Sequence, residues 1–318
     1  MKNIFSKLNL CWILFTTILL TVLTLLMQGG VINFYYQSIL FTIGINMILA
    51  ISLNLIIGVT GQFSLGHAGF MCIGAYAAAI ITKSNPNLGG FFVAVIVGGI
   101  ISALVALIVA IPTLRLKGDY LAIATLGFSE IVRIIVLNME ITNGAAGLFG
   151  IPKLTTWPLL VVCILVSLLV VLNFSRSAPG RACISIREDE IASEAMGINT
   201  TKYKTIAFVI GAVLASLAGA LYACNFYVVK PDLFTFNKSV DILILVVFGG
   251  MGSYTGSMIA AIVIGIINMY LQNFADIRMI IYGAALVLIM VFRPEGLLGT
   301  KEFTFSGLFK RLSKKKGV

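Results

Sequence analysis

The side chains best able to do chemistry lie where the sequence is otherwise apolar. Amide, hydroxyl and imidazole groups interrupt this apolar stretch at Asn46, Asn54, Gln62, Ser64 and His67. Hydrocarbon offers them no hydrogen-bond partner, so each must face protein or a cavity. A second region, at Gly250, Gly252 and Ser253, allows close backbone approach and predicts a tight turn or a constriction. All these residues are candidates for lining a path through the molecule, although we expect His67 to be a hydrogen-bonded packing residue.

Other kinds of chemistry lack the residues they need. His67 is the single histidine, which excludes a bis-histidine haem within one chain and an H-E-x-x-H zinc site. The chain contains no G-x-x-x-x-G-K-[ST] phosphate loop and no G-x-S-x-G nucleophile elbow. Its five cysteines form no C-x-x-C pair and are interpreted as packing residues. We expect no cofactor and no metal, and any nucleotide hydrolysis must occur on a partner.

The composition predicts that these residues are positioned by membrane-spanning helices. Hydrophobic residues make up 59% of the 318 positions and charged residues only 11%, against about 25% charged in an average soluble domain. Runs of about 20 apolar residues are long enough to cross a bilayer. Spans are predicted near 10–27, 37–58, 62–82, 90–111, 120–138, 157–174, 205–228, 239–251, 256–272 and 277–293. Glycines interrupt the third and eighth spans, so broken or re-entrant helices are expected there within an all-α polytopic membrane bundle.

Basic residues predict the orientation of the bundle and its division into parts. Lysine and arginine in short loops tend to stay cytoplasmic, and an even number of spans places both termini inside. The predicted inner side holds Lys2, Lys7, Arg115, Lys117, Arg176, Arg181, Arg187, Lys202, Lys204, Arg293 and the basic tail, and the outer loops hold Lys83, Lys153, Lys230, Lys238 and Arg278. We divide the chain into an uncleaved signal-anchor span with its outer loop (1–36), a core (37–299) and a cytoplasmic tail (300–318). The net charge of +10 then reflects membrane orientation and lipid contact, not nucleic acid.

The longest polar stretch, residues 175–204, is predicted to contain a short amphipathic helix. Good helix formers extend from Glu188 to Met196, acidic residues stand at the start, and Gly197 can close the end. Ile191, Ala195 and Ile198 recur at helical spacing. A solitary helix of this length is marginal in water, so it must rest either on the bilayer surface or, as we favour, on a soluble partner.

Two further patterns predict packing within the bundle. Glu130 and Arg133 are three residues apart in a predicted span, and a structural ion pair would lower the cost of burying both charges. Small residues recur every fourth position at Gly211, Ala215, Gly219 and Ala223, and again at Gly252, Gly256 and Ala260. Small residues permit close helix approach, and we favour intramolecular packing over a subunit contact.

A series of motifs, in order along most of the chain, carries a family resemblance. They are 52–55 (SLNL) with Gly58, 61–68 (GQFSLGHA), 74–76 (GAY), 114–122 (LRLKGDYLA), 125–128 (TLGF) with Glu130 and Arg133, 142–144 (TNG) with Gly147, 186–190 (IREDE), 194–198 (EAMGI), 249–253 (GGMGS) and 292–298 (FRPEGLL). Between Asn46 and Gly299 the sequence resembles the LivM-type permease subunits of ABC importers for branched-chain amino acids.

The resemblance implies a coupling helix in the 175–204 segment, where such permeases engage their ATPases. Its residues would be Glu188, Ile191, Glu194, Ala195, Met196, Gly197 and Ile198. The segment departs from the family's E-A-A…G pattern, because Met196 replaces the second alanine and the glycine follows sooner.

The implied partners are two ABC ATPase subunits, a second permease subunit, an extracytoplasmic substrate-binding protein and membrane lipid. The implied location is the bacterial cell membrane, and the implied substrates are leucine, isoleucine and valine, moved by alternating access. A urea or amide permease is the alternative, and a passive channel is a further one.

Overall fold

The computed structural model describes residues 33–113 and 118–271, together with positions 283, 284, 296 and 299. Its longer helices are α2 (Phe34–Asn54), α3 (His67–Ser84), α4 (Leu88–Thr113), α5 (Asp119–Asn138), α6 (Trp157–Arg176), α9 (Thr200–Phe226), α10 (Phe236–Gly249) and α11 (Tyr254–Leu271). Shorter elements are the π-helical turn η1 (Leu55–Val59), the 3-10 turns η2 (Glu140–Thr142), η3 (Gly144–Ala146) and η4 (Pro231–Phe234), and the helices α7 (Ala178–Glu188) and α8 (Glu190–Ala195). A two-residue antiparallel ladder joins β1 (Leu148–Phe149) to β2 (Val228–Val229).

The described part of the chain is an all-α membrane bundle. Five of its segments are long and apolar enough to cross a membrane, and the bent pair α10–α11 makes a sixth if it is counted as one span. The five are Phe34–Val59, Leu88–Thr113, Asp119–Asn138, Trp157–Arg176 and Thr200–Phe226. The predicted first span (10–27) and the tail (300–318) lie outside the described residues, as does the tenth span (277–293) apart from positions 283 and 284.

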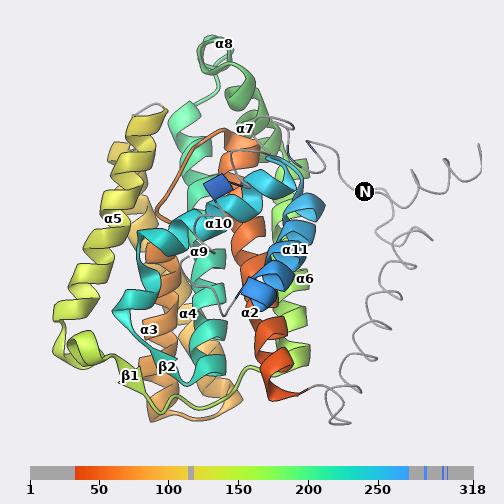
Figure 1. Cartoon of the computed structure of the whole chain (residues 1–318). Helices are drawn as coiled ribbons and strands as arrows, with labels where there is room; N and C mark the ends of the chain where they lie inside the picture. Colours follow the sequence, from red (N-terminus) through yellow and green to blue (C-terminus); the bar gives the residue numbers. More distant parts are fainter. Residues whose placement is uncertain (1–32, 114–117, 272–282, 285–295, 297–298, 300–318) are drawn as a thin grey trace, which may run out of the picture.

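Of the five spanning segments, two are largely buried within the bundle and three cover its outside. About 72% of the apolar window of α2 and 67% of that of α9 are buried, against 28% for α4, 33% for α5 and 28% for α6. The outer helices therefore keep apolar side chains exposed, as expected where hydrocarbon and not water is the solvent. Figure 1 shows α8 at one end of the bundle and the β1–β2 ladder at the opposite end.

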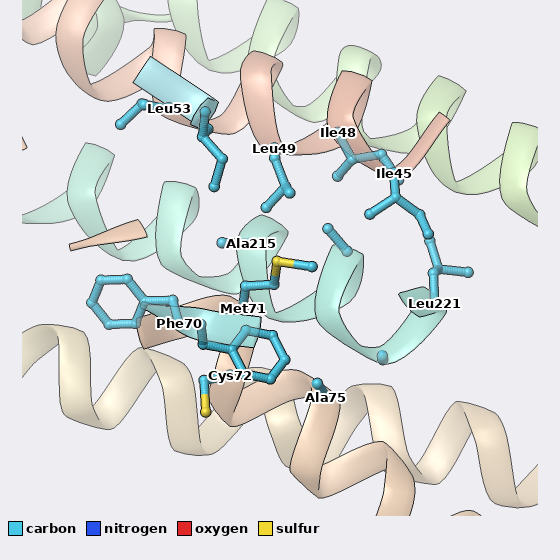
Figure 2. Packing of buried hydrophobic residues seen from close by; sticks show 14 of the residues in the cluster. Ile45, Ile48, Leu49, Leu53, Phe70, Met71, Cys72, Ala75, Ala215 and Leu221 are labelled. Carbon is cyan, nitrogen blue, oxygen red and sulfur yellow. The ribbon is translucent and has the colours of Figure 1, made fainter. Parts of the chain in front are cut away.

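The core lies where α2, α3 and α9 meet. Figure 2 shows Ile48 and Leu49 of α2 facing Met71 of α3, with Ala215 of α9 between them, and these side chains are almost fully buried. A Cβ atom on Gly219 would stand 2.0 Å from the Met71 carbonyl oxygen, and one on Gly211 would stand 2.6 Å from Ile56 Cδ1. The small-residue face of α9 thus packs within the chain, as predicted, and brings the helix backbones into contact.

The glycine-rich interruptions divide two of the predicted spans. The predicted span 62–82 is corrected to a break at residues 61–66 followed by α3, which begins only at His67. Gly61 has φ +70°, a left-handed conformation that ends the preceding helix. At the second site α10 and α11 meet at 120° across residues 250–253, so the spans predicted at 239–251 and 256–272 form one sharply bent pair.

Candidate functional site

The amide of Asn54 holds the break between α10 and α11. Its Nδ2 donates to the Gly250 carbonyl (3.2 Å), the Ser253 carbonyl (2.9 Å) and Ser257 Oγ (2.7 Å), and its Oδ1 accepts from the Gly252 N–H (2.8 Å). Asn54 is fully buried at the end of α2. Asn54 thereby pairs the Gly252 N–H and adds a hydrogen bond to the Gly250 and Ser253 carbonyls, which also accept from the Ser253 and Ser257 N–H groups. Four of the residues selected from the sequence, Asn54, Gly250, Gly252 and Ser253, meet at this point.

Gly58 permits this contact because it has no side chain. A Cβ atom there would lie 2.3 Å from the Gly252 nitrogen and 2.2 Å from Asn54 Oδ1. Gly58 belongs to the π-helical turn η1, which follows α2 directly. Such turns occur frequently at functional sites in helices. The backbone of η1 therefore rests directly against the α10–α11 break.

His67 is hydrogen-bonded at the N-terminus of α3. Its Nε2 is hydrogen-bonded to Ser52 Oγ (2.7 Å), and the Ser52 hydroxyl also lies within donating distance of the Leu49 carbonyl (2.9 Å). Beside it the Ala68 N–H donates to Ser239 Oγ of α10 (3.3 Å). These contacts match the expected packing role of His67, and they join α3 to both α2 and α10.

Two buried polar groups near His67 have no partner among the described residues. These are His67 Nδ1 and the Gln62 amide, whose nitrogen and oxygen are both unpaired there. Gln62 is 3% exposed and lies in the break between η1 and α3. Ser64, in the same break, accepts a long hydrogen bond of 3.4 Å from the Gly66 N–H. Because buried polar groups normally find partners, this break has hydrogen-bonding capacity that water or a passing solute can use.

Arg187, at the end of α7, connects the polar segment to the same region. Its Nη1 donates to the Gly58 carbonyl (2.5 Å), while Nη2 lies 2.6 Å from Glu188 Oε1. The Arg187 Cγ would be 2.8 Å from a Cβ atom on Gly61. The sequence indicates Arg187 only as part of a family motif and as a charge on the inner side. Its contact with Gly58 joins residues 129 apart in sequence, which no local pattern could reveal.

The helix predicted from Glu188 to Met196 is shorter than expected: it is α8, which begins at Glu190 and ends at Ala195. α7 ends at Glu188, and Asp189 caps α8 by accepting from the Ala192 N–H at Oδ1 (3.0 Å). Aspartate is a preferred N-cap residue, which explains why the chain restarts here. At the other end Gly197 has φ +82°, its N–H donates to the Glu194 carbonyl, and Ile198 N–H donates to the Ser193 carbonyl. This Schellman closure is the role predicted for Gly197.

α8 is fastened on its polar side and presents its apolar side outward. Lys204 of α9 pairs with Glu190 (2.6 Å), and Thr200 Oγ1 donates to Glu194 Oε1 (2.8 Å). On the other side Ile191 is 75% exposed and Met196 is 82% exposed. Ala195 and Glu188 are exposed too, whereas Ile198 is half-buried. Of the predicted strip, Ile191 and Ala195 are therefore exposed and Ile198 is not, and Met196 adds a further exposed apolar side chain.

Glu130 and Arg133 form an ion pair one turn apart on α5. Arg133 Nε lies 2.7 Å from Glu130 Oε2, and the side chains are 22% and 28% exposed. Both stand apart from the Asn54 contacts. The pair satisfies both charges locally, in line with a structural role.

Asn46 lies away from the other candidates, beside Lys238, a cation that the sequence predicts in an outer loop. Asn46 is at the middle of the apolar segment Phe34–Val59, and its Oδ1 accepts from Lys238 Nζ (3.1 Å). Lys238 belongs to α10, which begins at Phe236, so the outer-loop placement is corrected. Sequence reasoning ended the loop too late because Asn237, Lys238 and Asp241 make the start of α10 polar.

Asn46 and Lys238 border a cavity of about 400 Å³ between α2, α10 and α11. Asp241 lines the same cavity one helical turn after Lys238. Within residues 33–113 and 118–271, no cluster of three or more histidine, cysteine, aspartate or glutamate side chains could hold a metal ion. The site consists of polar groups, bent helices and this cavity.

Comparison with known proteins places these features in a family. The chain is 38% identical over 290 residues to the high-affinity branched-chain amino acid transport system permease proteins LivM of Salmonella typhimurium and of Escherichia coli K12, covering 80% of this chain and 68% of each relative. It is 25% identical to the Salmonella typhimurium permease protein LivH, over 80% of this chain and 91% of that one. No solved structure matches it.

The family model described as branched-chain amino acid transport system, permease component, matches residues 35–290 and so includes every described helix of the bundle. The matched region contains the bent pair α10–α11 and the α7–α8 segment. The chain is therefore a multi-pass membrane protein that belongs to the permease-component family of branched-chain amino acid transport systems.

Proposed function

We propose that the chain is a transmembrane permease subunit of an ATP-driven ABC importer for leucine, isoleucine and valine. Its family membership and the names of its relatives support this substrate class. The observation that carries the proposal is α8, a short helix fastened on its polar side, whose apolar side chains Ile191 and Met196 point away from the bundle. Large exposed apolar side chains supported in this way are typical of a protein-binding surface.

We interpret α8 as the coupling helix to which a separate ATPase subunit binds. Figure 1 shows α8 beyond the end of α5, at the tip of the bundle. A helix resting on the bilayer would turn its apolar side towards the spanning helices, where lipid begins. Ile191 and Met196 are highly exposed on an element that α7 and α9 hold at the tip of the bundle, and we therefore favour a soluble partner over the bilayer surface.

Movement of α8 would reach the spanning helices through Arg187. A single residue, Asp189, separates α7 from α8, and Arg187 joins the end of α7 to the Gly58 carbonyl. Gly58 packs on Gly252, and Asn54 one turn earlier holds the α10–α11 break. These contacts form a continuous path from the exposed helix to the bend, as a mechanical link requires. In our mechanism ATP closes two ATPases, α7 and α8 are displaced, and the bend changes to alternate access between the two sides.

The complete assembly follows from this role. We propose ten spans with both termini cytoplasmic, the α8 end being the inner end, where Arg176, Arg181, Arg187, Lys202 and Lys204 are concentrated. The core would extend over 37–299. Partners would be two ATPases, an extracytoplasmic binding protein and a second permease; a heterodimer is favoured because both LivM and LivH of Salmonella typhimurium resemble this chain.

The alternatives predict different transport behaviour. A urea or amide permease of the same architecture would take up urea and not leucine. A passive channel would conduct its solute without ATP and without the ATPases. Leucine uptake that depends on the ATPases supports the importer and excludes both alternatives.

The ATPase contact is tested with Ala195→Arg in the complete transporter. Ala195 is exposed on α8, so the new charge enters the proposed interface without entering the core. We expect normal membrane insertion, loss of ATPase co-purification and loss of leucine uptake. The matched control is Ala146→Arg, an exposed alanine of η3 far from α8. Gly197→Arg is a weaker test because φ of +82° also strains the backbone. Unchanged co-purification and unchanged uptake in Ala195→Arg would refute the coupling assignment.

The transmission step is tested with Arg187→Ala. It removes the bond to Gly58 and leaves Ile191 and Met196 in place, so we expect ATPase association to persist while leucine uptake falls. Arg181→Ala is the control, because Arg181 lies on the same helix and its side chain donates locally, to the Arg176 carbonyl. If uptake persists in Arg187→Ala, the link does not pass through this side chain.

A further inference from the structure

The cavity beside Asn46 combines opposite charges with aliphatic walls. Polar lining groups come from Ser38, Thr42, Asn46, Lys238, Asp241 and Asn268. Its apolar lining includes Ile39 and Ile43 of α2, Ile244 and Leu245 of α10, and Ile264 of α11. Its volume of about 400 Å³ falls in the range of small-molecule sites.

The position of the two charges is unusual for a spanning bundle. The Lys238 ammonium contacts Asn46, which stands midway along the apolar segment Phe34–Val59. That point is on the order of 18 Å along the helix from Phe34, at 1.5 Å per residue. Asp241 follows Lys238 by three residues and so lies on the same face of α10. Ionisable groups at mid-membrane are costly, and their presence generally marks a substrate or ion pathway.

We propose that this cavity is a transient binding site for the zwitterion of an aliphatic amino acid. Lys238 receives the α-carboxylate, Asp241 receives the α-ammonium, and the isoleucine and leucine side chains enclose the branched side chain. Both charged residues also have other interactions. The substrate would therefore replace existing partners of these side chains when it binds. The inference rests on the proposed importer function and adds where, and through which groups, the substrate pauses.

The cavity is also placed to respond to the bend. Lys238 and Asp241 lie in the first two turns of α10, and the other end of the same helix is the break that Asn54 holds. Any rotation of α10 about that break moves both charges relative to Asn46 on α2. The same motion that opens one side of the bundle would therefore separate the groups that hold the zwitterion and release it.

Binding is tested by protection of a cysteine placed in the cavity. In the purified complete transporter, without ATP and without the binding protein, Ile39→Cys is modified with a small methanethiosulfonate reagent. We expect millimolar L-leucine to slow modification several-fold. Two analogues should protect much less: 4-methylpentanoate, which lacks the ammonium, and L-leucinamide, which lacks the carboxylate. Ala146→Cys, at an exposed position of η3 outside the cavity, is the matched control and should react at the same rate with or without leucine.

Charge recognition is tested by neutralising each group. Loss of a hydrogen bond to a charged group corresponds to roughly ten- to hundredfold weaker binding. Asp241→Asn should weaken protection by leucine and abolish its advantage over 4-methylpentanoate, and Lys238→Met should do the same relative to L-leucinamide. A merely structural role would not change these two preferences separately. Lys230→Met, which removes a lysine outside the cavity, should leave both preferences intact.

The outcomes separate this inference from the importer proposal. Protection by leucine at Ile39→Cys needs neither ATP nor coupling, so it can succeed even where Ala195→Arg shows that α8 binds no ATPase. If leucine uptake is ATP-driven but leucine leaves Ile39→Cys unprotected, or both analogues protect equally well, the cavity is not the zwitterion site.

Discussion

Gly58→Ala tests the contact on which the proposed link depends. The added methyl group would lie 2.2 Å from Asn54 Oδ1, 2.3 Å from the Gly252 nitrogen and 2.7 Å from the Gly252 Cα. Two of these atoms are backbone, so only the Asn54 side chain can rotate away. Overpacking costs about 1–3 kcal/mol. Displacing Asn54 also breaks its hydrogen bond to the partly buried Gly252 N–H, and leaving that donor unpaired costs about 1–3 kcal/mol of stability. Together they predict about 2–6 kcal/mol of destabilisation.

The assay is thermal unfolding in detergent, followed with a dye that becomes fluorescent on reacting with cysteine. Cys72, Cys183 and Cys224 are buried, so near neutral pH they become reactive only when the bundle opens. Gly58→Ala should unfold several degrees below the parent chain and should transport less leucine. Gly127→Ala is the matched control, because nothing lies within 4 Å of its added Cβ atom, and a helical alanine is favoured over glycine. Equal midpoints for Gly58→Ala and the parent would refute the close packing of η1 on the break.

Three other predictions follow from the same contacts. Gly219→Ala should lower the free energy of unfolding by at least about 1–3 kcal/mol, because its Cβ atom would lie 2.0 Å from the Met71 carbonyl oxygen. Gly99→Ala is the control and should be neutral, because the atom nearest to its Cβ lies 3.6 Å away. The same dye assay compares the two variants. Glu190→Gln should leave Lys204, with 10% of its side chain exposed, without its counter-charge and lower the free energy of unfolding by about 1–3 kcal/mol. Amide hydrogen exchange in α8 should become faster. Unchanged exchange would exclude this anchoring of α8. Burial raises the pKa of the Cys183 thiol to about 11, so in the folded chain its alkylation, followed by mass spectrometry, should be negligible at pH 8 and rise towards pH 11, and rapid labelling at pH 8 would contradict that burial.

Helix positions were predicted well where the apolar run itself determined them. The predicted spans 90–111, 120–138 and 157–174 correspond to α4, α5 and α6 within two residues at each end. These outer helices face lipid, so their composition must be apolar over the full length. α3 behaves differently: it is enclosed by other helices, and the break before it replaces the predicted start of its span. Burial within protein removes the need for a continuous apolar run, so hydropathy locates such a helix less accurately.

The end of the short helix α8 could be predicted from local sequence patterns, but its start could not. Gly197 was correctly expected to close it, because a left-handed residue after a helix is a local requirement. The division at Asp189 was missed, although aspartate is a preferred cap, because acidic residues at 188 to 190 suit a helix start at any of three positions. Contacts of Glu190 with Lys204 and of Ser193 with Ser185 select the observed start.

By itself, the sequence determined that this chain is a helical membrane protein and which side chains must avoid lipid. These properties depend on composition and on local spacing, because hydrocarbon penalises every unpaired polar group wherever the chain folds. Only the tertiary structure decided which polar groups meet. Asn54 bonds to residues nearly 200 positions away, Arg187 reaches Gly58, and Lys238 reaches Asn46. Such contacts depend on how glycine faces let helices approach and bend, and this geometry has no local signature in the sequence.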